Sequence, residues 1–392
     1  EVTPAIGDTQ FEENNPLSQG NTYYYPTIVN PSVVNTVVGG FMYETIVDAS
    51  GNGDYTTLGA AIKAGKKRIF IRKGTYTENE WGAGTGGLSI DSNTIIIGEH
   101  RDEVVLNFDN PKQIIIGDSG SGSNGYTTGT VTLTNGSSTV TGSGTSWLAN
   151  ATAGQWLITK GRAYKISSVT DNTNLVLENI YQGITSSLNE YGITINATTG
   201  VHLKSFTIQS RKASVGAGII DVFRPLIHSS FDDIKILSQV YSSSNAIDFS
   251  GEFFSAIRIT NCVFRGGFQY GIYMAGAADE QNGNVIITNN SITGCNQSGI
   301  LIPSFSIISN NFISDSNIGI TVNSETTGRG LCVITSNIII RCINGISSIQ
   351  NKSGYNNNVI VGNIVWTEED GNNFDINSIA TGGSFSNAGQ NI

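Results

Sequence analysis

The chain has 392 residues, a formal net charge of −10 and only 13% charged residues. The acidic balance argues against a nucleic-acid partner, which would need a basic face, and no apolar run is long enough to span a membrane. Gly, Ser, Thr and Asn are abundant while strong helix formers are scarce, so the composition predicts an all-β chain of short strands and tight turns.

Residues 1–42 show no clear period, and we expect an extended arm that packs on a neighbouring chain or joins a larger assembly. Residues 43–117 then open the regular part of the chain. Within them, Thr57–Lys63 has the apolar spacing of a short amphipathic helix, and Arg68–Arg72 reads as a strand. A helix there would cap the open end of a stack of strands and remove an exposed edge.

Residues 118–187 interrupt this regular part. After a Gly/Ser-rich linker, alternating strands separated by turn pairs such as Asn135-Gly136 predict a small inserted antiparallel module. The expected strands are Thr130–Leu133, Thr139–Val140, Trp156–Thr159, Tyr164–Val169 and Asn174–Leu177.

Three aromatic residues of this module leave two interpretations open. Trp147, Trp156 and Tyr164 fit either the core of a small β domain or a platform on which sugar rings stack. The sequence favours the core, because a module of this size needs large apolar side chains inside it.

Residues 188–392 carry an internal repeat without any helical pattern. One corner residue marks each coil, at Ser205, Asp233, Cys262, Asn290, Asn311, Asn337 and Asn363. The repeat predicts a right-handed parallel β-helix as the main body, since one coil can bury its apolar face only against the next. Corner asparagines tolerate left-handed backbone, and their amides can form a ladder from coil to coil. A β-sandwich with coincidental Asn turns is the alternative.

The four cysteines are Cys262, Cys295, Cys332 and Cys342. None stands in a CxxC pair or beside a histidine, so we expect no zinc site, no other metal and no cofactor. We interpret them as small buried apolar residues rather than as disulfides.

Candidate catalytic residues follow from the alternation of side chains along each strand. Where the isoleucine that repeats once per coil points inward, the next residue points outward, which places Asp221, Asp248 and Tyr273 in one outer column. Carboxylates one coil apart lie about 5 Å from each other, close to the spacing in retaining glycosidases. Asp221, Asp248 and the nearby Glu252 are therefore the expected acid, base or nucleophile. The alternative is that these are ordinary solvated surface residues.

Candidate substrate-binding residues lie close by in the sequence. Arg224 could hold an acidic sugar and His228 follows it, while Tyr270 and Tyr273 offer area for stacking.

Two segments resemble a known fold family. Residues 48–79, DASGNGDYTTLGAAIKAGKKRIFIRKGTYTEN, resemble the opening of pectate-lyase-superfamily β-helices, and NTIIIGEHRDEVVLNF at 93–108 is similar to the coil that normally follows. The resemblance implies the β-helix fold. It does not assign a reaction, because the NTDG and GHG motifs of polygalacturonase-like hydrolases and the QDT motif of pectin methylesterases are absent.

The module is similar to one common in bacteriophage tail fibres and tailspikes. The runs that carry this resemblance are GSSTVTGSGTSW (136–147), the strand ending YKISSV (164–169) and NLVLENIYQG (174–183). It implies a homotrimer in the virion tail, which acts at the bacterial surface on a capsular or O-antigen polysaccharide. The N-terminal region would then join other tail proteins.

The leading hypothesis is a tailspike that depolymerises this polysaccharide by glycoside hydrolysis, or by lyase elimination with Tyr273 or His228 as base and Arg224 neutralising a uronate. A non-enzymatic tail fibre or adhesin that only binds glycan is the alternative. A free secreted pectinase-like enzyme is a third hypothesis.

Overall fold

The computed structural model describes residues 36–38, 41–78, 87–108, 113–117, 125–159, 162–188, 191–194, 197–210, 218–238, 244–249, 253–274, 283–302, 305–324, 332–350, 358–367 and 376–380. Almost all of this part is β-structure, with two short helices. Most of the expected N-terminal arm lies outside the described residues. No described helix is long and apolar enough to cross a membrane.

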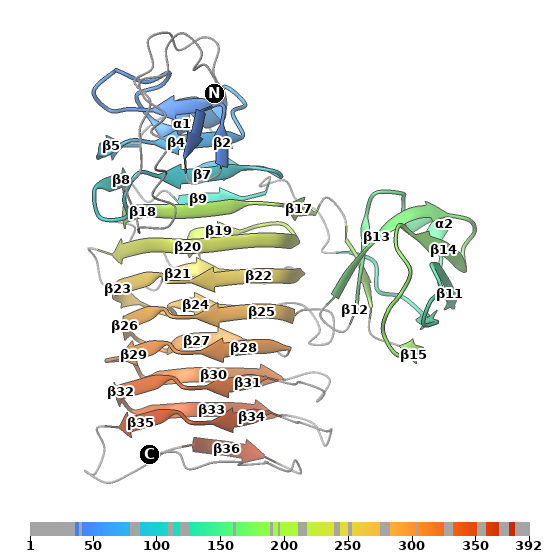
Figure 1. The fold of residues 1–392 in the computed structure, drawn as a ribbon. Coiled ribbons are helices and arrows are strands. Elements are labelled where there is room, and N and C mark those ends of the chain that lie inside the picture. Colours follow the sequence, from blue (N-terminus) through green and yellow to red (C-terminus); the bar gives the residue numbers. More distant parts are fainter. Residues whose placement is uncertain are drawn as a thin grey trace, which may run out of the picture.

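The main body is a parallel β-helix, which confirms the predicted fold class (Figure 1). One wall is a nine-stranded parallel sheet with β6 (Gly87–Ile90), β9 (Gln113–Ile116), β19 (Gly218–Val222), β21 (Asn245–Asp248), β24 (Ile272–Tyr273), β27 (Ser298–Ile302), β30 (Ile318–Ser324), β33 (Asn344–Gln350) and β36 (Ile376–Ala380).

The other walls form one bent eighteen-stranded sheet. It contains β3 (Thr45–Val47), β4 (Arg68–Ile71), β5 (Gly74–Thr77), β7 (Ile95–Gly98), β8 (Val104–Phe108), β17 (Thr198–Thr199), β18 (His202–Ser210), β20 (Leu226–Ser238), β22 (Phe254–Thr260), β23 (Val263–Phe268), β25 (Gly283–Thr288), β26 (Ser291–Cys295), β28 (Ser306–Ser309), β29 (Phe312–Ser314), β31 (Val333–Thr335), β32 (Ile338–Cys342), β34 (Val359–Val361) and β35 (Ile364–Thr367). A separate antiparallel pair joins β1 (Thr36–Val38) and β2 (Phe41–Tyr43).

The core is a set of apolar columns that run from coil to coil. One column is in continuous parallel register and fully buried: Ile220, Ile247, Ile272, Ile300, Ile320 and Ile346. Each coil thus buries its apolar face against the next, as the repeat predicts. All four cysteines are free and buried in this stack, which confirms their interpretation as apolar residues.

The first coils are capped by α1 (Leu58–Lys63), in agreement with the predicted helix. The Thr57 hydroxyl accepts a hydrogen bond from the Ala60 amide, which is an ordinary N-cap contact. The buried Glu78 carboxylate also accepts hydrogen bonds from the amides of Leu58 (2.8 Å) and Gly59 (2.9 Å). These contacts satisfy the first amides of the helix, which would otherwise lack partners.

The inserted module is a seven-stranded antiparallel sheet, and it projects from the side of the β-helix (Figure 1). Its elements are β10 (Thr130–Leu133), β11 (Thr139–Ser143), α2 (Trp147–Asn150), β12 (Trp156–Thr159), β13 (Arg162–Val169), β14 (Asn174–Leu177), β15 (Ser186–Leu188) and β16 (Gly192–Ile193). Because β16 belongs to this sheet, the module continues beyond residue 187. The coils before and after the module pair directly, since β18 pairs with β7 and β8 on one side and with β20 on the other.

A ladder of buried asparagine amides marks the corner of the later coils. The Nδ2 of Asn290, Asn311 and Asn337 each donates to the Oδ1 of the ladder asparagine one coil further on, at 2.8–2.9 Å, and Asn363 ends the series. The predicted ladder is confirmed for these four residues.

Two corner assignments were one residue out of register. Ser205 and Asp233 align with Asn261 and Asn289, the left-handed positions that precede the ladder column, at φ of 55° to 58°. The ladder column itself continues toward the N-terminus through Cys262 and Ile234. The left-handed backbone and the ladder amide thus belong to two successive residues, because the turn moves the following side chain into the core.

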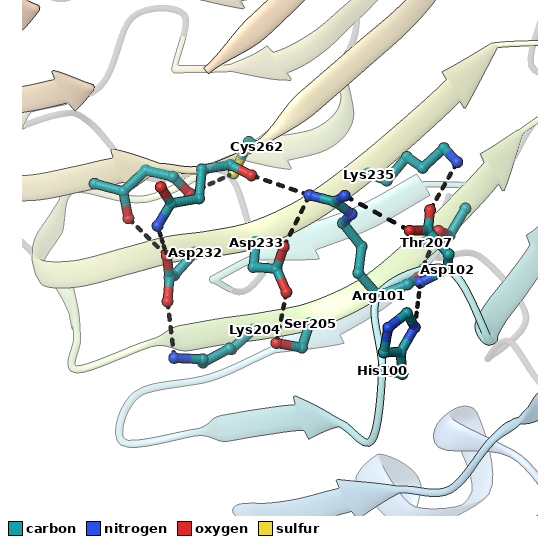
Figure 2. A network of polar contacts seen from close by, with 12 residues as sticks. His100, Arg101, Asp102, Lys204, Ser205, Thr207, Asp232, Asp233, Lys235 and Cys262 are labelled. Carbon is teal, nitrogen blue, oxygen red and sulfur yellow. Dashed lines mark hydrogen bonds and ion pairs between the residues drawn. The ribbon is translucent and has the colours of Figure 1, made fainter. Parts of the chain in front are cut away.

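A network of charged side chains covers the corner of the early coils (Figure 2). Arg101, in the turn before β8, binds Asp233 at 2.9 Å, and Lys235 binds Asp102 at 2.8 Å. Asp232 accepts hydrogen bonds from Thr260 and Asn261 and pairs with Lys204 at 2.9 Å. The network therefore links the coil before the module to the coils after it.

This network predicts a loss of stability in acid. Burial alone would raise the pKa of Asp232, but hydrogen bonds from Lys204, Asn261 and Thr260 outweigh burial and lower it. A folded pKa below the unfolded value of about 3.9 stabilises the protein above that value, and this contribution is lost as pH falls through the folded pKa. Melting temperatures of wild type and Asp232→Asn should therefore differ at about pH 6, and the difference should shrink as pH falls below about 4. A constant difference would contradict this.

Candidate functional site

The structure stacks the predicted column of Asp221, Asp248 and Tyr273 on successive strands. In parallel register, Asp221 on β19 pairs with Asp248 on β21, which pairs with Tyr273 on β24. The backbones of neighbouring coils are about 4.8 Å apart, so the two carboxyl groups emerge side by side.

Both carboxylates are covered, which differs from the solvent-facing column expected from the sequence. Asp221 is 6% exposed and Asp248 is 2% exposed. The column continues with residues that are equally hidden: Leu301, Thr321 and Ser347. The interpretation of Asp221 and Asp248 as plain solvated residues is therefore wrong. Carboxylates that are this buried need partners or a chemical role.

Asn245 holds Asp248 from the same strand, and sequence reasoning missed it. Its Nδ2 donates to Asp248 Oδ2 at 2.8 Å, and its Oδ1 accepts from the amide of Tyr270 at 3.2 Å. One amide thus links the carboxylate to the next coil. Asn245 stands three residues before Asp248, and this short spacing was the only signal in the sequence.

Glycine allows the close packing around these groups. A side chain at Gly218 would place its Cβ 2.8 Å from Asp248 Cβ, and one at Gly117 would meet the Cγ of Arg224 at 2.5 Å. Arg224 is 7% exposed and packs over Gly117, so the turn after β19 is tightly filled.

Tyr270 and Tyr273 form an aromatic pair beside the carboxylates. Their ring centroids are 4.7 Å apart and both side chains are half-buried. Burial raises the pKa of the Tyr270 hydroxyl. Glu252, the third expected catalytic residue, lies outside the described residues.

His228 lies apart from this group. It is exposed at the start of β20, and its ring meets Trp156 of the module edge to face, at a centroid distance of 5.3 Å. The structure therefore divides the expected site residues between the nine-stranded wall, which carries Asp221, Asp248 and Tyr273, and the junction with the module.

This junction contains a cavity of about 570 Å³, here called the junction groove, which sequence reasoning did not anticipate. Its walls are Trp156, Arg162, Ala163, Tyr164, Lys165, Glu178, Asn179, Ile180, Gln182, His228, Ser255, Ala256 and Asn284. Of the three aromatic residues with two interpretations, Trp147 is fully buried in the module core, while Trp156 and Tyr164 line the groove.

The fold is that of parallel β-helix proteins. Neither a protein-family model nor a curated protein matches the chain. Among solved structures, the tailspike gp61 of Pseudomonas phage phi297 has a TM-score of 0.39 at 12% identity, over 77% of this chain and 62% of that one. The gp54 tailspike of Acinetobacter baumannii bacteriophage AP22, solved with capsular saccharide, has a TM-score of 0.28 at 11% identity, over 80% and 63%.

A family 28 exopolygalacturonase of Yersinia enterocolitica has a TM-score of 0.33 at 13% identity, over 86% of this chain and 76% of that one. This chain thus spans less than two thirds of the two tailspikes. At such scores and identities the similarity carries no argument about substrate or reaction.

Proposed function

We propose that this protein is a phage tailspike that binds and depolymerises a bacterial surface polysaccharide, either capsule or O-antigen. The observation that carries the proposal is the register that stacks Asp221 on Asp248, with Asn245 fixing the second carboxylate. Two buried carboxyl groups on successive coils are a costly arrangement for a protein to keep without a role.

The chemistry would be glycoside hydrolysis. Carboxyl groups about 5 Å apart suit the retaining mechanism, in which one attacks the sugar and the other protonates the leaving oxygen. Tyr270 and Tyr273 would stack against the sugar, Arg224 would neutralise an acidic one, and Glu252 stays a candidate partner. Because Asp221 and Asp248 are covered, the substrate can reach them only if the groups above them move aside.

Lyase elimination is the close variant. A base such as Tyr273 would remove the proton next to a uronate carboxylate while Arg224 neutralises that carboxylate. A C=C bond would then form as the glycosidic C–O bond breaks, and the leaving oxygen would take up a proton. The two reactions differ in their products, since elimination leaves an unsaturated sugar that absorbs ultraviolet light and hydrolysis does not.

The test is depolymerisation by purified protein. Capsular and O-antigen polysaccharides from a panel of bacteria are incubated with it, and chain length and ultraviolet absorbance are followed. Shortening of at least one polysaccharide is expected, without a rise in absorbance for a hydrolase. If no chain is shortened while one is bound, the alternative holds: a non-enzymatic tail fibre or adhesin. The junction groove favours that alternative, because it offers a binding site without the acidic pair.

Assembly into a homotrimer in the virion tail, with residues 1–42 joining other tail proteins, is part of the proposal. An exposed apolar column supports self-association: Phe312, Ile338 and Ile364 are in register and 38–49% exposed, and Trp366 nearby is 70% exposed. Toward the N-terminus the same column becomes partly polar, with Lys235, Val263 and Ser291. Exposed apolar columns of this kind favour burial against another chain.

We therefore expect a particle mass of three times 41.6 kDa in light scattering. Ile338→Glu should dissociate it, since three buried charges would face one another. The control Leu148→Glu changes an exposed apolar residue of the module and should leave the mass unchanged. A wild-type mass of 41.6 kDa would contradict the trimer and favour a free secreted enzyme.

A further inference from the structure

We propose that the junction groove is a second polysaccharide site, which binds a segment that carries carboxylate groups such as uronates. Asp221, Asp248, Tyr270 and Tyr273 are absent from its lining. Binding in the junction groove is therefore a separate property from cleavage at Asp221 and Asp248. Either proposal can be correct without the other.

The shape of the groove suits a sugar segment. Its volume of about 570 Å³ lies within the usual range for small-ligand sites, roughly 300–1,000 Å³, and junctions between structural units are common places for them. One wall comes from β12, β13 and the segment after β14, and the other from β20, β22 and β25. A small apolar cluster of Ile158, Ile227 and Phe253, with Trp156 packed against it, joins the two walls.

Aromatic side chains line the groove on the module side. Trp156 is half-buried and packs on His228, and Tyr164 packs on Tyr181 at a centroid distance of 5.5 Å. Rings fixed in this way offer apolar area at little entropic cost, and their polar atoms can bond hydroxyl groups. The exposed amides of Asn179, Gln182 and Asn284 add hydrogen-bonding capacity around them.

The charge of the groove selects for acidic sugars. Its lining holds two permanent cations, Arg162 and Lys165, against one anion, Glu178. Lys165 Nζ is 3.3 Å from Glu178 Oε1, so that pair is largely neutralised and the exposed Arg162 supplies the excess. A cationic groove is unexpected on a chain with a net charge of −10. A guanidinium also matches a carboxylate with two parallel hydrogen bonds.

Arg162 and Tyr164 stand two residues apart on β13, so their side chains leave the same face of that strand. Both line the groove. Burial raises the pKa of the Tyr164 hydroxyl, and the neighbouring Arg162 acts in the opposite direction. A guanidinium and an aromatic ring on one face are the combination that would hold a carboxylate and the face of its sugar together.

A repeated corner of the coils shapes the β-helix wall of the groove. His228, Ala256 and Asn284 follow one another in register and all have positive φ, from 51° to 56°. The same left-handed backbone continues at Phe305 in the next coil, outside the groove lining, so it belongs to the regular corner of the coils. This corner places the small side chain of Ala256 between His228 and Asn284 on the groove wall.

The experiment uses labelled capsular oligosaccharides that contain uronates, each paired with the same oligosaccharide after chemical reduction of its carboxyl groups. We expect the full-length protein to bind at least one acidic member, and the reduced form to bind about ten-fold more weakly or worse. Equal affinity for the two forms would overturn the inference. Absence of acidic binding while depolymerisation continues would overturn this inference alone.

Variants locate the binding. Arg162→Ala, at an exposed position, should weaken acidic binding about ten-fold, and Glu178→Gln should strengthen it several-fold because it frees Lys165. A merely structural role of the groove would not produce a gain. Arg68→Ala and Leu148→Ala change exposed residues that are absent from the groove lining, and they serve as controls for Arg162→Ala and Trp156→Ala. Wild-type affinity in both Arg162→Ala and Trp156→Ala would overturn the proposal.

Discussion

Asp248→Asn is expected to lower kcat for depolymerisation by about 10²- to 10⁴-fold, the usual contribution of a general acid, base or nucleophile. Asparagine has the shape of aspartate and keeps one oxygen that can accept the Asn245 hydrogen bond. It cannot transfer a proton or attack the sugar. Binding of the polysaccharide should change little, so the loss falls on turnover. Asp221→Asn should behave alike.

Melting temperature and product analysis separate chemistry from folding. The control is Asp91→Asn, because the Asp91 side chain is 67% exposed and belongs to the early coils. We expect all three variants to stay folded at assay temperature and only the two at the acidic pair to lose turnover. If Asp221→Asn and Asp248→Asn lower the melting temperature but cleave at the wild-type rate well below it, the pair is structural.

Asn337→Ala should give the largest loss of stability, about 3–5 kcal/mol. Asn337 Oδ1 accepts hydrogen bonds from the amide and from the Nδ2 of Asn311, and its own Nδ2 donates to Ile308 O at 3.0 Å and Asn363 Oδ1 at 2.8 Å. Truncation leaves two buried donors of Asn311 without an acceptor. Each unsatisfied buried group costs about 1–3 kcal/mol.

Asn310 offers a matched control one coil away. It is exposed, with φ of 56°, and it stands just before a ladder asparagine. Asn310→Gly should change stability by only a few tenths of a kcal/mol, because glycine adopts this backbone readily. Thermal and denaturant unfolding measure both variants. An equal small effect at the two positions would show that the amide ladder does not stabilise the coils.

The coils were predictable because their cause is local. A repeated isoleucine and a corner residue fix the inward and outward faces of each strand, and turn pairs such as Asn135-Gly136 fix the hairpins of the module. Assignment of the corner failed by one residue at Ser205 and Asp233. In these early coils the ladder position holds the apolar Phe206 and Ile234, so the left-handed residue before it is the only polar candidate of these two positions for the corner.

For the candidate site, the sequence predicted only which residues lie beside one another on successive strands. Alternation along a strand places Asp221 and Asp248 on the outer face, but it cannot say what covers that face, and both are buried. The separation of His228 from Arg224 could not be predicted either. Between Arg224 and His228 the chain turns from one wall of the β-helix to the next. Residues that are close in the sequence therefore lie on different walls. The junction groove depends on how the module packs on the coils, which no local pattern encodes.

A crystal structure of the Asp248→Asn protein with an oligosaccharide of a polysaccharide that the wild type cleaves tests the central claim most directly. The account predicts a sugar over the nine-stranded wall, with a glycosidic oxygen about 3 Å from Asp221 or from the introduced amide. Sugar bound only in the junction groove, with Asp221 and the residue at 248 still covered, would contradict it.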